Sequence, residues 1–99
     1  MIQEVDTSPA EVLTFNRGKL LVEVDTSAGT WTAGGNLLLP PSPSDGTRVL
    51  VKDSGAQAGT KSIVVDGNGN NIDDQLTREI TNPFESLLLT YDGTQWAVI

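Results

Sequence analysis

Apolar and polar residues alternate with a period of two along most of the chain, which is typical of β-strands with one buried face. The clearest case is KLLVEV at 19–24, where Leu20, Val22 and Val24 share one phase. The segments with strand character are 19–25, 36–39, 47–52, 61–65, 76–81, 86–91 and 94–99. Helical spacing is almost absent, so the sequence predicts an all-β fold.

Short turns rich in Asp, Asn and Gly separate the predicted strands. Asp92-Gly93 is the preferred pair for a two-residue type I′ hairpin, which makes the last two strands antiparallel. Pro40, Pro41 and Pro43 end the strand before them and indicate a stiff crossover or loop. Six to eight short strands spaced in this way predict a small antiparallel β-sandwich or barrel-like domain over residues 19–99.

Residues 1–18 differ from this body, and we predict an N-terminal arm or a short helix there. Ser8-Pro9-Ala10-Glu11 has the form of a helix start, with Ser as the N-cap and Pro at the first helical position. The apolar residues of the segment are Val12, Leu13 and Phe15. They either pack on the body of the same subunit or contact a partner.

Two further features of the sequence have two readings each. The pentapeptide EVDTS occurs at 4–8 and again at 23–27, but the similarity stops there, which indicates coincidence or similar turn chemistry, not a repeat. Trp31 lies in the Gly-rich stretch AGTWTAGG, where it either packs over a sheet end or anchors a partner contact. Trp96 alternates with polar residues in the last strand and is expected in the core.

The composition favours one small domain that gains stability by association. The chain has 99 residues, of which 5% are aromatic, so its core is thin and oligomerisation is a common remedy. A net charge of −7 with only six scattered Lys and Arg residues argues against nucleic acid and anionic membranes as partners. No run is long and apolar enough for a membrane span, and the first residues lack the pattern of a signal peptide.

The absence of Cys and His from the sequence removes most catalytic chemistry. Without Cys there is no disulfide, thiolate nucleophile or Cys-based metal site, and without His the usual general base near neutral pH is missing. The sequence therefore predicts no enzyme, no catalytic residues and no cofactor.

The stretch VVDGNGNNIDD at 64–74 places five oxygen-bearing side chains close together. With Asp66 at position 1 of an EF-hand loop, Asn68 and Asn70 fit positions 3 and 5, but Thr77 at position 12 cannot supply the bidentate carboxylate. The EF-hand is therefore rejected and no metal site is predicted. A weak cation site formed by Asp66, Asp73 and Asp74 stays open beside the simpler reading, tight turns between strands.

A set of residues over 36–99 carries a resemblance to a known β-module. The set comprises Val51-Lys52-Asp53, Gly55, Ala58, Ile63, Ile72-Asp73, Asp92-Gly93-Thr94 and Trp96. It resembles the β-module of bacteriophage virion structural proteins, which are head decoration (cement) or head-fibre proteins and segments of tail fibres and spikes. Asp74 departs from the pattern, because many such modules have Gly there. The resemblance implies a homotrimer located in the virion.

These observations predict a capsid decoration or cement protein that binds the major capsid protein as a homotrimer, assembled in the host cytoplasm. In this interpretation the contacts with partners come from Val12, Leu13, Phe15 and Trp31. The alternative is a short tail-fibre or baseplate protein that binds a receptor or acts as an adaptor, in which Trp31 and the Gly/Asn loops form a glycan-binding surface.

Overall fold

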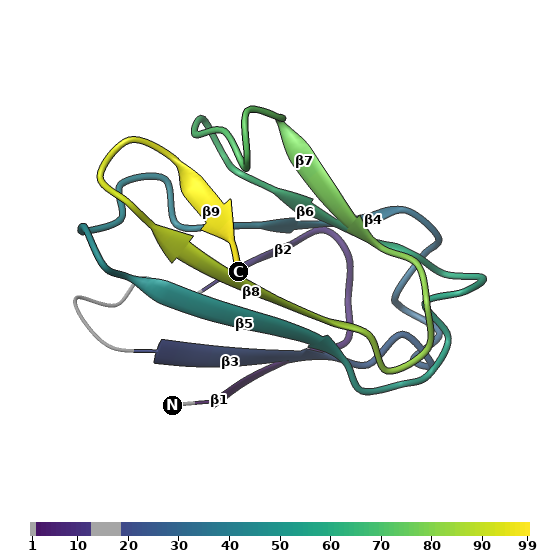
Figure 1. The fold of residues 1–99 in the computed structure, drawn as a ribbon. Helices are drawn as coiled ribbons and strands as arrows, with labels where there is room; N and C mark the ends of the chain where they lie inside the picture. The colour runs from purple at the N-terminus through teal and green to yellow at the C-terminus, as the bar shows by residue number, and fades with distance from the viewer. Residues whose placement is uncertain (1, 13–18) are drawn as a thin grey trace.

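The computed structural model describes residues 2–12 and 19–99, which form nine short strands in two sheets (Figure 1). The five-stranded sheet contains, in spatial order, β1 (Ile2–Val5), β3 (Lys19–Val24), β5 (Arg48–Asp53), β8 (Ser86–Tyr91) and β9 (Trp96–Val98). The four-stranded sheet contains β2 (Ala10–Glu11), β4 (Gly35–Leu38), β6 (Ile63–Asp66) and β7 (Thr77–Ile80). The described residues contain no helix, which confirms the all-β prediction.

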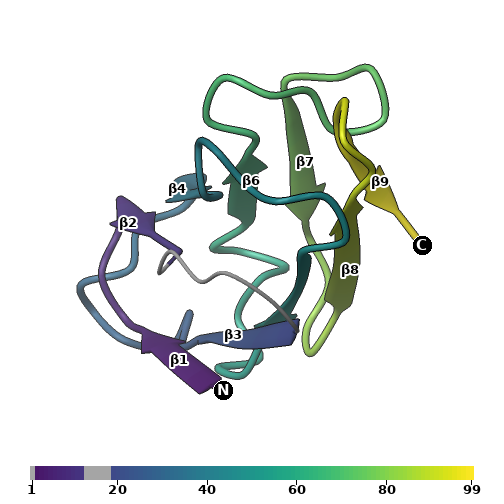
Figure 2. The ribbon, with the colours of Figure 1, turned by 90° about the vertical axis from the view of Figure 1, so that its left-hand side faces the viewer.

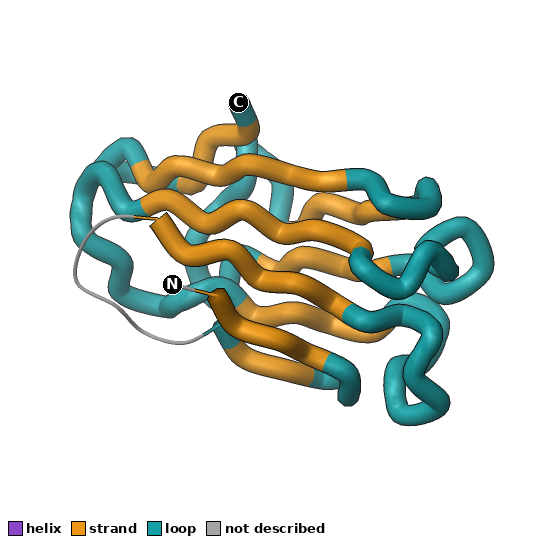
Figure 3. The backbone as a smooth tube through the Cα atoms, turned by 90° about the horizontal axis from the view of Figure 1, so that it is seen from below, coloured by secondary structure: helices purple, strands orange, loops and turns teal. Residues whose placement is uncertain are grey.

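The two sheets lie as separate layers of a sandwich and do not close into a barrel (Figure 2). The sandwich alternative is therefore confirmed and the barrel-like one is wrong. The nine strands exceed the six to eight predicted, because residues 2–12 supply β1 and β2. Figure 3 shows the strands of both layers crossing the molecule in similar directions, with the loops gathered at the two ends.

The direction of the strands differs from the antiparallel arrangement that we predicted. From β1 to β6 the chain alternates between the two sheets, so neighbours in each sheet run parallel as far as β5 and β6. Only the pairs β5–β8, β6–β7 and β8–β9 are antiparallel. Parallel neighbours need a long crossover, and here each crossover passes through a strand of the other sheet. A period-two pattern does not encode strand direction, which is why the prediction was wrong.

The two EVDTS segments occupy equivalent positions on adjacent parallel strands. Glu4 pairs with Glu23 and Val5 with Val24. The Asp25 N–H donates to the Val5 carbonyl at 2.7 Å, which extends the pairing past the strand ends. The turns that follow differ in their hydrogen bonds, because the Ser27 N–H donates to the Asp25 carboxylate at 3.0 Å whereas the Ser8 N–H donates to the Thr30 carbonyl at 3.2 Å.

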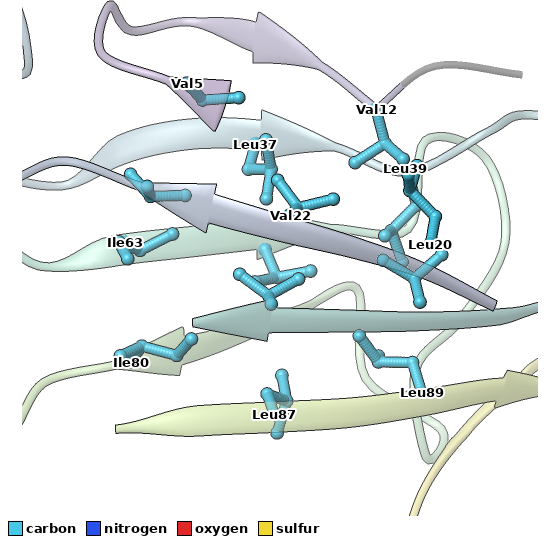
Figure 4. Close-up of a cluster of buried hydrophobic side chains, with 14 of the residues drawn as sticks. Val5, Val12, Leu20, Val22, Leu37, Leu39, Ile63, Ile80, Leu87 and Leu89 are labelled. Carbon is cyan, nitrogen blue, oxygen red and sulfur yellow. The ribbon is translucent and has the colours of Figure 1, made fainter. Parts of the chain in front are cut away.

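The core fills the space between the sheets and is built from the inward phase of each strand (Figure 4). Leu20, Val22 and Val24 are fully buried, as the alternation predicted. Most other members are aliphatic as well: Val5, Val12, Leu37, Leu39, Val49, Val51, Ile63, Val65, Ile72, Ile80, Leu87 and Leu89. Trp96 is also fully buried, which confirms its predicted place, and its ring meets that of Tyr91 edge to face.

Residues 2–12 belong to the two sheets. β1 is an edge strand beside β3, and the short β2 pairs Ala10 with Leu37 and Glu11 with Leu38. The helix start expected at 8–11 is therefore wrong. Ser8 does not cap a helix; its Oγ accepts the Thr32 N–H at 3.0 Å and so ties two loops together. Residues 13–18 of the predicted arm lie outside the described residues.

The hairpin of β8 and β9 is antiparallel, as predicted, but its loop is longer. Tyr91 pairs with Trp96, so the loop contains four residues, and among them only Gly93 has a positive φ, of 96°. Asp92 accepts the N–H groups of Thr94 and Gln95 at 2.8 and 2.9 Å. The hydrogen bond from Gln95, then that from Thr94, lowers the pKa of the Asp92 carboxyl. The two-residue type I′ turn is therefore wrong.

Candidate interaction surface

The predicted contact residues that the structure describes are buried within the chain. Val12 is 4% exposed and points between the layers toward Leu39 and Leu20 (Figure 4). Trp31 is 1% exposed, and its Nε1–H lies 3.4 Å from the Ser62 carbonyl oxygen. Both therefore follow the reading in which they pack on their own subunit. Leu13 and Phe15 lie outside the described residues.

The turn after β6 uses its polar side chains to hold neighbouring backbone. The Asp66 carboxylate accepts the Asn68 N–H at 2.7 Å. The side-chain amides of Asn68 and Asn70 donate to the carbonyls of Leu39 and Pro41, each at 3.0 Å. Asn68 has a φ of 53°, which is the positive φ that the Gly/Asn composition predicted. This turn therefore fixes the Pro-rich segment that follows β4.

The acids at the end of the turn connect it to the C-terminal strand. Asp73 accepts the Val98 N–H at 3.2 Å and lies 3.4 Å from the Arg78 guanidinium. The Asp74 N–H donates to the Gln95 side chain at 2.8 Å. Within the described residues, no three acidic side chains are grouped so that they could hold a metal ion.

Asp53, at the end of β5, is a fully buried carboxylate that joins three loops. It accepts hydrogen bonds from the Thr26 hydroxyl at 2.6 Å and from the N–H groups of Gly55, Ala58 and Phe84 at 3.1 to 3.3 Å. Burial raises its pKa, but the bond from Thr26 and the three backbone bonds outweigh burial and leave the pKa below its usual value. Four donors occupy this carboxylate, which gives it a structural role.

A shallow acidic cleft lies where the two EVDTS segments stack, and Glu4, Asp6, Glu23 and Asp25 line it. Asp25 accepts the Ser27 N–H at 3.0 Å and so serves its own turn. Nothing in the cleft points to a particular ligand.

A row of large aliphatic side chains crosses the outer face of the five-stranded sheet. The strand register places one such residue of β1, β3, β5 and β8 side by side, and Ile99, which follows β9, donates its N–H to the Leu88 carbonyl at 3.0 Å. We call this set the aliphatic row: Ile2, Leu21, Leu50, Leu88 and Ile99. The ends of the row are the most exposed, with Ile2 at 61% and Ile99 at 75%, while the three leucines are half-buried. Five strands spaced by about 4.8 Å give the row a length of about 19 Å. Contiguous apolar surfaces are common at protein–protein contacts, which makes the row a candidate for one.

Charged residues flank the aliphatic row on both sides. Lys19 and Arg48 lie two positions from the row in one direction along the strands, and we call them the basic flank. Glu4 and Glu23 lie two positions from the row in the other direction, and we call them the acidic flank. Lys52 follows Glu23 in the same line, but its ammonium donates to the Phe84 carbonyl at 2.6 Å. This face therefore has three cations and two carboxylates in a chain whose net charge is −7.

The outer face of the four-stranded sheet has a different character. Among the described residues of this sheet, the outward strand positions include the acids Glu11, Asp66 and Glu79 and no basic residue. Its large aliphatic residues, Leu38 and Val64, are half-buried. The exposed apolar surface of the sheets is thus concentrated on the five-stranded side.

Sequence reasoning did not identify the aliphatic row, although part of its signal is visible in the sequence. Leu21 and Leu50 occupy the polar phase of strands whose other phase forms the core. An apolar residue in that phase indicates that the outer face of the sheet also forms a contact. Their alignment could not be read from the sequence, because it depends on which strands are neighbours.

The comparisons with known proteins returned no match: no protein-family model matches the sequence, and no curated protein matches it. Over the described residues, no helix is long and apolar enough to cross a membrane.

Proposed function

We propose that this chain is a bacteriophage virion structural protein, a capsid decoration or cement protein that binds and stabilises the shell of the major capsid protein as a homotrimer. The observation that carries the proposal is the aliphatic row on the outer face of the five-stranded sheet. Such a surface serves protein–protein binding, and it needs no catalytic group or cofactor.

The residues that resemble the phage β-module support this proposal at the level of the fold. Ala58, Ile63, Ile72 and Trp96 are at most 1% exposed, and Asp53 is the buried carboxylate described above. Buried residues of this kind specify a scaffold and not a reaction. The resemblance therefore concerns the kind of body that displays the binding surface.

The proposed mechanism is burial and avidity. A trimer that contacts several capsid subunits binds them with a higher apparent affinity than one copy does, because later contacts form at a high effective concentration. Ligands that bind only the assembled state stabilise it by mass action. The bound protein thereby opposes disruption of the shell by the pressure of packaged DNA.

The tail-fibre or baseplate alternative has less support. Its glycan surface depends on an accessible Trp31, and that side chain is 1% exposed. Counting the copies per virion separates the two locations: hundreds of copies indicate the head, and a few to some dozens indicate the tail.

The test of the proposed function is co-sedimentation with undecorated capsids assembled from the major capsid protein of the same phage. The wild-type protein is expected to pellet with the capsids and to raise their melting temperature. A Leu13→Ser/Phe15→Ser variant, which alters two residues of the predicted arm, is expected to keep its own melting temperature and to lose capsid binding. Normal binding by this variant contradicts the role of the arm, and failure of the wild type to bind contradicts the function.

A further inference from the structure

We infer that the aliphatic row is the contact between copies of this chain, which assemble around a rotation axis parallel to the row, with Lys19 of each copy facing Glu23 of the next. This inference rests on the proposed function, because it identifies the surface that forms the proposed oligomer. It also leaves the remainder of the body and the predicted arm to the capsid.

The first argument is the shape of the apolar surface. The row runs across β1, β3, β5 and β8 to Ile99, which follows β9, and it is most exposed at its ends, Ile2 and Ile99. Rows that lie parallel to a common axis meet along their whole length of about 19 Å. Each copy then removes the apolar side chains of the others from water.

The second argument is the arrangement of the charges. A rotation axis parallel to the row brings opposite sides of the row in neighbouring copies together, at the same level along the axis. At the level of β5 it sets Arg48 opposite Lys52, whose ammonium is already bound to the Phe84 carbonyl. On β3, Lys19 and Glu23 lie two positions on either side of Leu21, so Lys19 of one copy meets Glu23 of the next. A face-to-face contact with its two-fold axis along the strands would instead place each flank against the same flank of the partner.

The third argument concerns the rest of the chain. This face has three cations and two carboxylates, although the molecule as a whole has a net charge of −7. Two acidic molecules repel each other at most orientations, so association is favoured through the face on which the cations outnumber the carboxylates. That face is the outer face of the five-stranded sheet.

The experiment measures the molar mass of the full chain by light scattering and sedimentation equilibrium over a range of concentrations. The wild type is expected to be a multimer, whose mass gives the number of copies. Ile99→Asp is expected to raise the dissociation constant at least about tenfold, because it places a carboxylate in the apolar contact. The matched control is Leu76→Asp, which introduces the same charge at a side chain that is also 75% exposed but precedes β7 of the other sheet. It is expected to change the constant by less than about twofold.

Charge reversal tests the partner and the axis. Lys19→Glu and Glu23→Lys are each expected to weaken association by roughly tenfold, and the double variant is expected to return to within about twofold of the wild type. Recovery requires that the two residues meet across copies, because on β3 they lie four residues apart along one strand. A double variant as weak as the singles overturns the axis and the pairing.

Two outcomes overturn the inference as a whole: a wild type that is monomeric at every concentration, or equal effects of Ile99→Asp and Leu76→Asp. If Ile99→Asp does not fold, judged by circular dichroism, Ile2→Asp tests the opposite end of the row. Failure of the proposed function can be distinguished from failure of this inference. A multimer that does not bind capsids contradicts the proposed function and leaves the inference standing. A monomer that binds capsids contradicts the inference and leaves capsid binding standing.

Discussion

At the scale of single residues, the polar side chains that first suggested a binding site form hydrogen bonds with backbone groups. Asp53 accepts four hydrogen bonds while fully buried, and the amides of Asn68 and Asn70 bind carbonyls of a distant segment. A buried acceptor that loses its charge leaves donors poorly satisfied, which costs more than the hydrogen bonds contributed. Asp53 is therefore the residue where a change of one atom has the largest expected effect.

Replacement Asp53→Asn is expected to lower the free energy of unfolding by about 2 kcal/mol, because the amide NH₂ faces N–H donors that the carboxylate accepts. Chemical denaturation at pH 7 measures the change. The matched control is Asp45→Asn at an exposed carboxylate, expected to alter stability by less than about 0.5 kcal/mol. Equal effects of the two substitutions would contradict the role of Asp53.

The wild type and the Asp53→Asn variant are also expected to differ in how their stability depends on pH. The pKa of Asp53 is lowered from 3.8 in the folded state, so its contribution to stability is present above that pH and is lost as the pH falls through the folded pKa. The difference in stability between the wild type and Asp53→Asn is therefore expected to be constant from pH 7 to about pH 5 and to shrink below about pH 4. A difference that grows in acid would contradict this sign.

At the scale of elements, the parallel pairing of β3 with β5 places the loops that follow these two strands against each other. The loop after β5 passes close to the turn after β3 at Gly55, where a Cβ would lie 2.5 Å from the Asp25 carboxylate and 2.5 to 2.6 Å from the N atoms of Ser27 and Thr26. Only glycine fits there without displacing the backbone of the neighbouring turn. The close approach follows from the pairing of β3 with β5.

The substitution Gly55→Ala is expected to destabilise the fold by at least about 2 kcal/mol, because neither loop can yield without breaking hydrogen bonds to Asp53. Thermal unfolding provides the measurement. Gly29→Ala is the control, since no atom of the described chain lies within 4 Å of its added Cβ, and it is expected to change stability by less than about 1 kcal/mol. A tolerated alanine at position 55 would contradict this packing of the two loops.

At the scale of the whole molecule, the acidic residues do not cluster, and the exposed aliphatic side chains of the sheets gather on one face, while Leu76 and Phe84 are exposed in loops. The chain has thirteen Asp and Glu residues, and where the structure describes them no three form a metal-binding group. The exposed aliphatic side chains of the sheets meet instead on one face, the outer face of the five-stranded sheet. We propose that this face binds another protein surface, and both the capsid test and the charge-reversal test address this proposal.

The distribution of the acids leads to a prediction about calcium. Addition of millimolar calcium is expected to change the melting temperature by less than about 1 °C relative to sodium chloride of equal ionic strength, because a ligand at free concentration c stabilises the fold by RT ln(1 + c/Kd), which is near zero when the ion binds only weakly. Differential scanning fluorimetry measures it. A rise of several degrees with calcium and not with magnesium would point to a site at Asp66, Asp73 and Asp74.

The sequence by itself determined the class of the fold and the content of its core. Alternation over 19–24 and 47–52 identified the buried phase, and Asp92-Gly93 located the final hairpin. These features are local, because the period of a strand and the chemistry of a turn depend on residues close together in the chain. The absence of Cys and His likewise limits the chemistry of the chain, whatever fold it adopts.

Only the tertiary structure decided the direction of the strands, the place of residues 2–12 in the two sheets and the alignment of the aliphatic row. Leu21, Leu50 and Leu88 are 29 and 38 residues apart along the chain, and they become neighbours only because β3, β5 and β8 pair in one register. Burial of Trp31 and Val12 was decided in the same way, by strands that are distant in sequence. Pairing between distant segments depends on the packing of the whole chain, which alternation within one segment does not encode.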